Sequence, residues 1–288
     1  MAAAIRRATT CSGRLTRQAK ARTRRLSHAE RWINDAVLIS NQPAYYQSIE
    51  VDVNRVSSAI KAARERGQRC TYTHVLVRST ALALSANPDL HKMLAGNRTQ
   101  SPSQADIAVS VGAKGAVVPT LVIRGAEKKS IYAIGDEIVR RVPEATEAHS
   151  KLLATLNRWG WILPVGFLRR GMLRLLFRSF NFRQKGVGTF QISMVAGVDE
   201  SATPLFNAAA ILVGGAVKDR VIAVGGLPVV RPTIRLTCSA DHRVWNGQDC
   251  QNFLLAVRDI ITSDQLEREI LNEPALDEPA FPSVAKIH

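Results

Sequence analysis

A chain of 288 residues, 46% of them hydrophobic, can bury one large core or two modest cores, so we expect one globular domain with extensions. The formal net charge of +15 attracts anions, which makes phosphorylated cofactors, nucleic acid and anionic lipid the candidate partners. Four cysteines without a C-x-x-C pair, and without histidines at zinc-ligand spacing, argue against a disulfide framework and a metal site. A reducing, cytoplasmic location is the simplest prediction.

The N-terminal segment, residues 1–24, is basic and contains no acidic residue. We expect a disordered basic arm there. Alternatively, its arginines among Ala, Ser and Thr are typical of an organelle transit peptide, which would place the protein in the mitochondrial matrix. No apolar segment of a secretory signal follows it.

Helical and strand patterns alternate in the first half of the chain. Ser27 followed by Glu30 is a capping-box pattern that opens a helix, and Gly67 and Pro88 mark the ends of two others. In chain order we predict a helix over 27–41, a strand over 45–53, helices over 54–67 and 73–86, two neighbouring strands over 106–111 and 116–123, and a helix over 130–141.

The stretch over about 150–185 has a different character, because aromatic and aliphatic residues are interleaved with arginines and no acidic residue occurs between Glu147 and Asp199. Its longest uncharged run, 159–168, is far below the ~20 residues that a membrane-spanning helix needs. Three interpretations are open: a segment lying on a membrane surface through 159–180, a lid over an apolar substrate channel, or a helical hairpin buried against the domain or a neighbouring subunit.

Strand patterns return after this stretch, and a final helix follows. We predict strands over 188–196, 208–217, 221–224 and 233–239, and a helix over 248–261. The pattern is that of an α+β domain with a mixed sheet, which we expect to span 25–265 with the apolar basic stretch as an insertion. Residues 266–288, rich in Pro and acidic residues from Glu273, are expected to form a loose tail.

The candidate catalytic residue lies in the string SADHRVWNG over 239–247, between the last predicted strand and the last helix. His242 suits the removal of a proton from a thiol or a hydroxyl group, because histidine exchanges protons near neutral pH. The other five histidines have no comparable setting. A Cys/His nucleophile using Cys238 or Cys250 is a weaker alternative, because a cysteine within a strand pattern is usually a small buried side chain.

The pattern His-x-x-x-(Asp or Asn)-Gly, formed by His242, Asn246 and Gly247, resembles the signature of the chloramphenicol acetyltransferase and dihydrolipoamide acyltransferase superfamily. The DHRV form at 241–244 resembles the catalytic domain of the 2-oxoacid dehydrogenase acyltransferases. Further blocks similar to this family occur in its order: DIAV at 106–109, VVP at 117–119, IRGAEKKS at 123–130, GTFQIS at 188–193 and AAILVG at 209–214. The resemblance covers about 25–261 apart from the insertion, and it implies a two-layer, chloramphenicol acetyltransferase-like sandwich.

The resemblance also implies a mechanism and an assembly. His242 would take the proton from the thiol of coenzyme A or dihydrolipoamide, and the thiolate would attack an acyl thioester; hydroxyl and amine acceptors are also open. Ser193 of a facing subunit would stabilise the oxyanion, so a homotrimer would be the active form. Asn246 stands where many relatives carry Asp, and an amide there orients the loop by hydrogen bonds without supplying charge.

The sequence contains no recognisable lipoyl domain or peripheral-subunit-binding module, so we expect a catalytic domain without a covalently bound cofactor. Coenzyme A or acyl-CoA, or a lipoyl or carrier-protein thioester, is the expected substrate, since phosphates pair readily with Arg and Lys. Nucleic acid is not expected as a partner, because the arginines lie among large aliphatic residues outside any recognisable nucleic-acid-binding fold. The alternative function is a catalytically silent scaffold or accessory subunit of the same fold, with or without membrane attachment.

Overall fold

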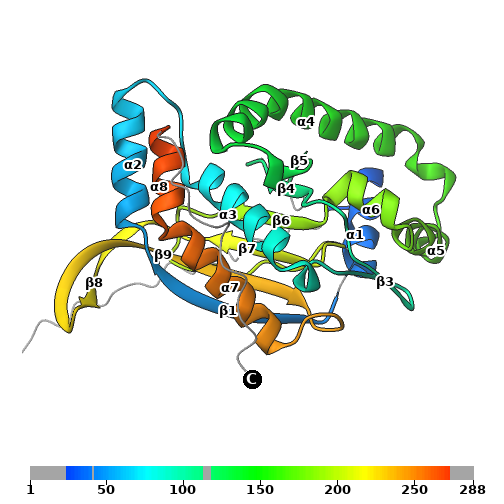
Figure 1. Ribbon diagram of the computed structural model, residues 1–288. Coiled ribbons are helices and arrows are strands. Elements are labelled where there is room, and N and C mark those ends of the chain that lie inside the picture. The colour runs from blue at the N-terminus through cyan, green and yellow to red at the C-terminus, as the bar shows by residue number, and fades with distance from the viewer. Residues whose placement is uncertain (1–23, 41, 113–117, 273–288) are drawn as a thin grey trace, which may run out of the picture.

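The computed structural model describes residues 24–40, 42–112 and 118–272, and a mixed β-sheet lies at its centre (Figure 1). Its seven strands follow the order β1-β9-β7-β6-β4-β5, and β8 pairs with β9. The pairs β4–β6 and β6–β7 are parallel, and the others are antiparallel. The strands are β1 (Ala44–Asp52), β4 (Ile107–Ser110), β5 (Thr120–Ile123), β6 (Phe190–Met194), β7 (Ala210–Gly214), β8 (Lys218–Val224) and β9 (Leu227–Asp241).

Helices form a second layer on one face of the sheet, and α3 and α7 lie directly over it (Figure 1). The predicted α+β fold with two layers and a mixed sheet is therefore confirmed. The helices are α1 (His28–Ile39), α2 (Asn54–Glu65), α3 (Tyr72–Ala86), α4 (Ile131–Trp159), α5 (Gly166–Phe177), α6 (Phe180–Val187), α7 (Gly247–Ile261) and α8 (Asp264–Leu271), with 3-10 turns η1 (Pro88–Leu90), η2 (Ala126–Lys128) and η3 (Gly160–Ile162).

The core lies between the sheet and the helical layer. Along α7, apolar residues such as Phe253, Val257 and Ile260 recur at helical spacing and are buried. Successive strand residues point to opposite faces, so Phe190 and Ile192 of β6 enter this core. Gln191 and Ser193, which alternate with them along β6, therefore lie on the other face of the sheet.

Several elements differ from the sequence prediction. The helix expected over 130–141 is α4, which continues past Pro143 to Trp159; a proline removes one backbone hydrogen bond, and here Asn157 fixes the far end by accepting a hydrogen bond from the Ala29 amide at 2.9 Å. A short hairpin of β2 (Met93–Ala95) and β3 (Arg98–Gln100) was not predicted, because three residues are too few to show an alternating pattern.

The prediction of a loose tail from 266 is wrong for its first residues. Helix α8 extends to Leu271 and is capped by the Ser263 hydroxyl, which accepts from the Leu266 amide at 3.2 Å. Leu266 and Ile270, four residues apart, are fully buried. The remainder of that segment, 273–288, and most of the basic arm, 1–23, lie outside the described residues, so both stay predictions.

The insertion comprises the end of α4, η3, α5 and α6, and it is attached to α1 (Figure 1). The Asp35 carboxylate, only 3% exposed, accepts from Arg169 Nε at 2.8 Å and from Arg170 Nη1 at 3.1 Å. Trp32 Nε1 donates to the Gly160 carbonyl at 3.2 Å, and a Cβ at Gly160 would lie 2.9 Å from that nitrogen. The segment is therefore helical and docked on the domain. None of the helices in the described ranges combines the length and apolar character needed to cross a membrane.

Candidate active site

The loop that carries His242 joins the end of β9 at Asp241 to the start of α7 at Gly247, as the sequence predicted. Its first residue is fixed to the start of β1, because the His242 amide donates to the Pro43 carbonyl at 2.8 Å. Its other end is anchored by Trp245, which is 2% exposed and packs edge-on to Phe253 with ring centroids 5.4 Å apart. The loop is thus held at two points by the folded domain.

A single hydrogen bond sets the chemical state of the His242 ring. Nδ1 lies 2.9 Å from the Trp245 carbonyl oxygen. A carbonyl only accepts, so Nδ1 must carry the hydrogen, and in the neutral ring the free lone pair is then on Nε2. His242 is exposed in the single chain, and the Tyr45 ring lies beside it with centroids 5.3 Å apart. The arrangement presents Nε2 as a proton acceptor.

Asp241 and Arg243 form an ion pair that fixes the backbone on both sides of His242. The Asp241 side chain is buried and accepts from Arg243 Nε at 2.8 Å, from Arg243 Nη2 at 2.7 Å and from Gln42 Nε2 at 2.6 Å. Burial raises the pKa of Asp241, but the hydrogen bonds from Arg243 and Gln42 outweigh it, so the pKa lies below its ordinary value. The carboxylate therefore stays charged, and Arg243 stays bound to it.

Asn246 is the N-cap of α7. Its side-chain oxygen accepts from the Asp249 amide at 2.9 Å, and Asp249 Oδ2 accepts from the Asn246 amide at 2.9 Å, so the two form a capping box. Next to it, a Cβ at Gly247 would approach the Tyr45 hydroxyl to 3.1 Å. In this chain, then, Asn246 holds the start of the helix, and an alanine would leave one amide of the first turn without a partner.

Ser193 lies on β6, half-buried, and the fold does not bring it to His242 of the same chain. The residue in line with it on β9 is Thr237, reached through Val213 of β7. Two strand spacings separate β6 from β9, about 10 Å, and the five positions from Thr237 to His242 add about 17 Å along the strand. Any site that uses both side chains must therefore take them from different chains.

The buried cysteines do not act as nucleophiles beside His242. Cys238 and Cys250 are both fully buried in the core. Burial, with a contribution from Cys250, raises the pKa of the Cys238 thiol well above its ordinary value. The thiolate that a Cys/His mechanism needs is therefore not available.

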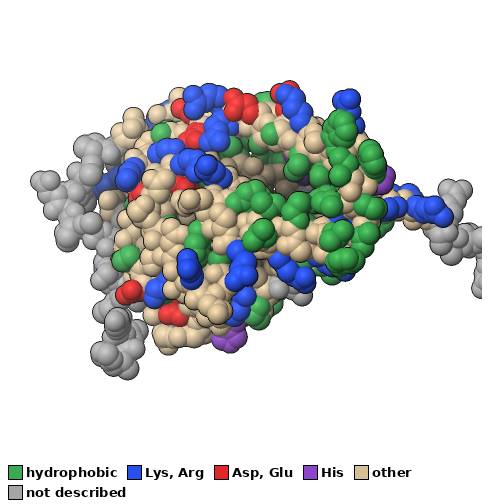
Figure 2. Space-filling model, turned by 90° about the vertical axis from the view of Figure 1, so that its right-hand side faces the viewer, with side chains coloured by type: hydrophobic (Ala, Val, Ile, Leu, Met, Phe, Trp, Pro, Cys, Tyr) green, Lys and Arg blue, Asp and Glu red, His purple; other side chains and the backbone are tan. Residues whose placement is uncertain are grey.

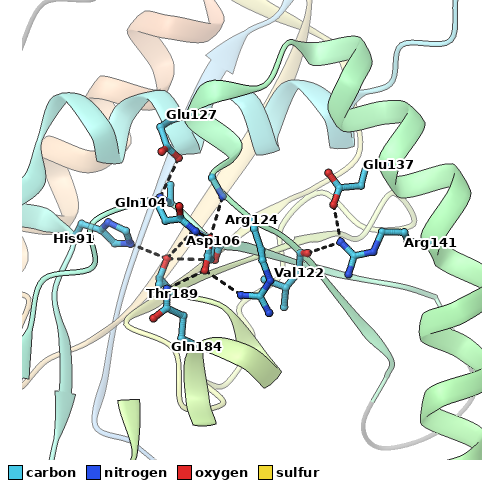
Figure 3. Close-up of polar contacts among 12 residues, drawn as sticks. His91, Gln104, Asp106, Val122, Arg124, Glu127, Glu137, Arg141, Gln184 and Thr189 are labelled. Atoms are coloured by element: carbon cyan, nitrogen blue, oxygen red, sulfur yellow. Dashed lines mark hydrogen bonds and ion pairs between the residues drawn. The ribbon is translucent and has the colours of Figure 1, made fainter. Parts of the chain in front are cut away.

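A second cluster of polar side chains, centred on Asp106, is structural (Figure 3). The fully buried Asp106 carboxylate accepts from the Gly125 amide at 3.0 Å, from Gln104 Nε2 at 2.8 Å and from Gln184 Nε2 at 2.9 Å. Arg124 adds a longer ion pair at 3.4 Å. The cluster joins the start of β4, the end of β5 and the end of α6, so it fixes the point where the insertion returns to the sheet.

His91 borders that cluster but does not suit proton transfer at neutral pH. Its Nε2 is 2.7 Å from the Thr189 hydroxyl oxygen, and the side chain is buried. Burial lowers the pKa of His91 to about 4, with Asp106 opposing the shift. The ring is therefore neutral at physiological pH, and its role is to fill and hydrogen-bond the interior.

Two residues beside His242 were missed by the sequence analysis, Gln42 and Tyr45. Tyr45 lies at the start of β1 and Gln42 just before it, about 200 positions before the loop. The pairing of Tyr45 with Ala240 in the β1–β9 ladder brings them there. A hydrophobic pattern predicts the strand but not its partner. No local signal in the sequence could have placed them at the site.

Comparison with known proteins identifies the family. The family model described as 2-oxoacid dehydrogenases acyltransferase (catalytic domain) matches residues 18–153 and 180–267, and the gap falls within the insertion. The acetyltransferase component of the pyruvate dehydrogenase complex of Bacillus subtilis is 25% identical over 75% of this chain and 44% of its own length. The mitochondrial succinyltransferase component of the 2-oxoglutarate dehydrogenase complex of Saccharomyces cerevisiae is 28% identical over 74% of this chain and 41% of its own length. The chain thus spans about half the length of the curated relatives it matches.

Solved structures share the fold. Dihydrolipoamide acetyltransferase of Azotobacter vinelandii, studied for the role of a serine, a histidine and an asparagine in its catalytic mechanism, has a TM-score of 0.64 at 20% identity, over 88% of this chain and 94% of that one. A truncated catalytic core of the 2-oxoacid dehydrogenase multienzyme complex of Thermoplasma acidophilum has a TM-score of 0.63 at 20% identity, over 84% and 98%. With the family model matching most of its length, the chain belongs to the family of 2-oxoacid dehydrogenase acyltransferase catalytic domains.

Proposed function

We propose that the chain transfers an acyl group between a thioester donor and a thiol, with His242 as the general base. Nε2 takes the proton of the attacking thiol, the new S–C bond forms at the thioester carbonyl, and a tetrahedral oxyanion results. Its collapse breaks the old C–S bond, and the departing thiolate receives the proton from the imidazolium. The observation that carries this proposal is the Nδ1 contact with the Trp245 carbonyl, because it leaves Nε2 free to accept.

The substrates are proposed to be coenzyme A, lipoyl or carrier-protein thioesters. The family membership and the names of the curated relatives support this choice. Purified protein incubated with a panel of acyl-CoA esters and dihydrolipoamide should release coenzyme A, which chromatography separates from the dithiol acceptor and detects. A protein that releases none with any donor would be the silent scaffold of the same fold instead.

Ser193 is proposed to stabilise the oxyanion from a neighbouring subunit of a homotrimer. Support comes from the sheet register, which separates Ser193 from His242 within one chain, and from the Azotobacter vinelandii relative. In that relative the histidine and asparagine studied are four positions apart, as are His242 and Asn246. Ser193→Ala is expected to lower kcat by about 10² to 10³, the usual effect of losing one oxyanion donor. Ser48→Ala, an exposed serine on β1, is the control and should leave kcat unchanged.

A mixing experiment tests whether the two side chains come from different subunits. Chains carrying Ser193→Ala and chains carrying His242→Ala, each with about a hundredth of the wild-type activity or less, are unfolded together and refolded. In trimers with sites between subunits, about a quarter of the sites regain both side chains, so activity returns. Mixtures that stay as inactive as the separate variants would rule out the shared site.

The insertion is proposed to contact an anionic membrane surface. The face that carries α5 and the end of α4 presents hydrophobic side chains with Lys and Arg around them (Figure 2). Phe167 is 66% exposed and Leu175 71%, and residues 148–198 contain no acidic side chain. Apolar side chains flanked by arginines are typical of segments that lie in the interface plane. The large exposed side chains are Leu152, Trp159, Trp161, Ile162, Val165, Phe167, Leu168, Met172, Leu175, Leu176 and Phe182.

Vesicle sedimentation tests this contact. The protein should pellet with vesicles that contain phosphatidylglycerol and stay in solution with phosphatidylcholine alone, because the arginines favour anionic headgroups. Phe167→Glu with Leu175→Glu should abolish pelleting. The control, Val139→Glu with Val198→Glu, adds the same charge at exposed positions outside the insertion and should pellet as the wild type does. Equal pelleting of the two double variants would contradict the proposal.

A further inference from the structure

A pocket of about 140 Å³ lies between the insertion and the loop that carries His242. Four of its lining residues are arginines, and we refer to it as the arginine pocket: Arg174, Arg178, Arg183 and Arg243. The first two come from α5 and its C-cap, Arg183 comes from α6, and Arg243 follows His242 directly. The volume is below the ~300 to 1,000 Å³ of sites for drug-sized ligands, so it suits one small group of a larger molecule.

The pocket carries an excess of positive charge. Arg183 is 4% exposed, and within the part of the chain that the structure describes its hydrogen bonds go to backbone carbonyls: to that of Asn207 from Nε at 2.7 Å, and to that of Leu94. Burial lowers the pKa of Arg183 to about 10, which still leaves the guanidinium charged at neutral pH. Buried charges in proteins are normally paired with an opposite charge. Arg183 makes no such pair among the described residues; Asp241 attracts it only from beyond hydrogen-bond distance.

The other arginines do not remove this excess. Within the described ranges, no carboxylate lies within ion-pair distance of Arg174 or Arg178, and both side chains are exposed at the mouth of the pocket. The nearby Asp241 carboxylate is already bound on two sides by Arg243. Four guanidinium groups thus face one neutralised carboxylate, which favours an anion at the centre.

The wall of the pocket is shaped to admit the Arg178 side chain. Its guanidinium lies over Gly96 in the β2–β3 turn, where a Cβ would come within 3.2 Å of Nη2. Gly96 also has a φ of +61°, a conformation that glycine adopts without strain. Phe177, next to Arg178, packs edge-on to Phe206 with ring centroids 6.2 Å apart and lines the same pocket. Several converging guanidinium groups are suited to bind a phosphate, because each can donate two parallel hydrogen bonds to its oxygens.

We propose that the arginine pocket binds a phosphate group of the thioester substrate, so that the insertion selects donors with a phosphorylated pantetheine arm. The inference rests on the proposed acyl transfer and deepens it. Arg174 and Arg178 lie between the two stretches that the family model matches, so the family pattern does not supply them. Arg243 lines the pocket and follows His242 directly in the chain, so the pocket adjoins the loop that carries the proposed base.

A series of donors tests the pocket in the absence of lipid. Acyl-CoA, the acyl ester of 3′-dephospho-CoA, acyl-4′-phosphopantetheine and acyl-pantetheine share the reacting thioester and differ in phosphates. For Arg174→Ala with Arg178→Ala, we expect KM for acyl-CoA to rise about tenfold to a hundredfold with kcat unchanged, since hydrogen bonds to charged groups have that effect on affinity. With acyl-pantetheine, which has no phosphate, variant and wild type should have the same KM.

Controls distinguish the effect of losing the pocket from the effect of losing positive charge elsewhere, and they test binding independently of turnover. Arg140→Ala with Arg158→Ala removes two arginines of α4 outside the pocket and should leave KM as in the wild type. If the KM of the pocket variant rises only for acyl-CoA and its dephospho form, the pocket binds the nucleotide phosphates. If the KM rises for acyl-4′-phosphopantetheine as well, the pocket binds the phosphate that carrier proteins also present. Calorimetric titration with coenzyme A measures whether the arginine pocket contributes to binding, even if the protein turns over no donor. Wild-type affinity in the pocket variant, or an equal loss with acyl-pantetheine, would overturn the proposal.

Discussion

His242→Ala is expected to lower kcat/KM for acyl transfer by about 10² to 10⁴, the contribution that a general base usually makes. Alanine removes Nε2, the lone pair that accepts the thiol proton, and it also removes the contact of Nδ1 with the Trp245 carbonyl. Steady-state release of coenzyme A from an acyl-CoA donor measures the effect. The loss should appear with every donor, because the proton transfer is common to all of them.

The rest of the loop should survive this substitution. The contacts that fix its backbone are the ion pair of Asp241 with Arg243 and the bond from residue 242's amide to the Pro43 carbonyl, and neither uses the imidazole. The unfolding midpoint and the oligomeric state should therefore match those of the wild type. His149→Ala, on α4, serves as the control for loss of a histidine. Full activity in the His242 variant would mean that the base is another group.

Asp106→Ala is expected to destabilise the folded chain by about 3 kcal/mol. The substitution leaves the buried Gly125 amide and the half-buried side-chain amides of Gln104 and Gln184 without their acceptor. A buried donor without a partner costs about 1 to 3 kcal/mol, and the two half-buried amides, which water can reach in part, add less. Arg124 adds little, because its side chain is 49% exposed and water can solvate it. Urea unfolding, followed by circular dichroism, measures the change in the free energy of unfolding.

Two further variants separate the contributions to this cluster. Asp106→Asn keeps the shape and one accepting oxygen of the side chain. Its free energy of unfolding should therefore lie between those of the wild type and the alanine variant. Arg124→Gln removes only the half-exposed ion pair and should cost below about 1 kcal/mol. Equal costs for Asp106→Ala and Arg124→Gln would show that the charge, and not the set of buried donors, stabilises the cluster.

The sequence predicted local elements well where periodicity and caps agree. The capping box of Ser27 and Glu30 opens α1 as expected, and Gly67 follows α2 with a φ of +77°. The prediction was wrong where tertiary contacts decide the structure. Helix α8 has two buried apolar residues, Leu266 and Ile270, which are too few to show a helical pattern in the sequence. The helix is stabilised by packing against α2, a tertiary contact that no local pattern predicts.

The candidate site was only partly predictable for the same reason. His242 could be found because its neighbours in sequence form a pattern, but its tautomer depends on a carbonyl that the loop folds back to reach. Tyr45 reaches the ring, and Gln42 the adjacent Asp241 carboxylate, through a strand pairing that no local pattern encodes. The arginine pocket likewise combines residues of α1, α5, α6, the β2–β3 hairpin and the catalytic loop, segments whose proximity follows from the fold alone.

The carbonyl that orients His242 belongs to a residue whose indole is embedded among aromatic rings. Trp245 touches Phe253, and Phe253 lies 5.0 Å from Phe190, centroid to centroid, at the start of the strand that carries Ser193. Replacing Phe253 with a smaller side chain would leave a cavity beside the Trp245 indole. The indole would shift into that cavity, and the Trp245 carbonyl would move away from His242 Nδ1. The turnover number would then fall in a variant whose altered side chain does not contact the substrate. The close packing of the core fixes the position of the Trp245 carbonyl, and that carbonyl fixes the orientation of the His242 ring.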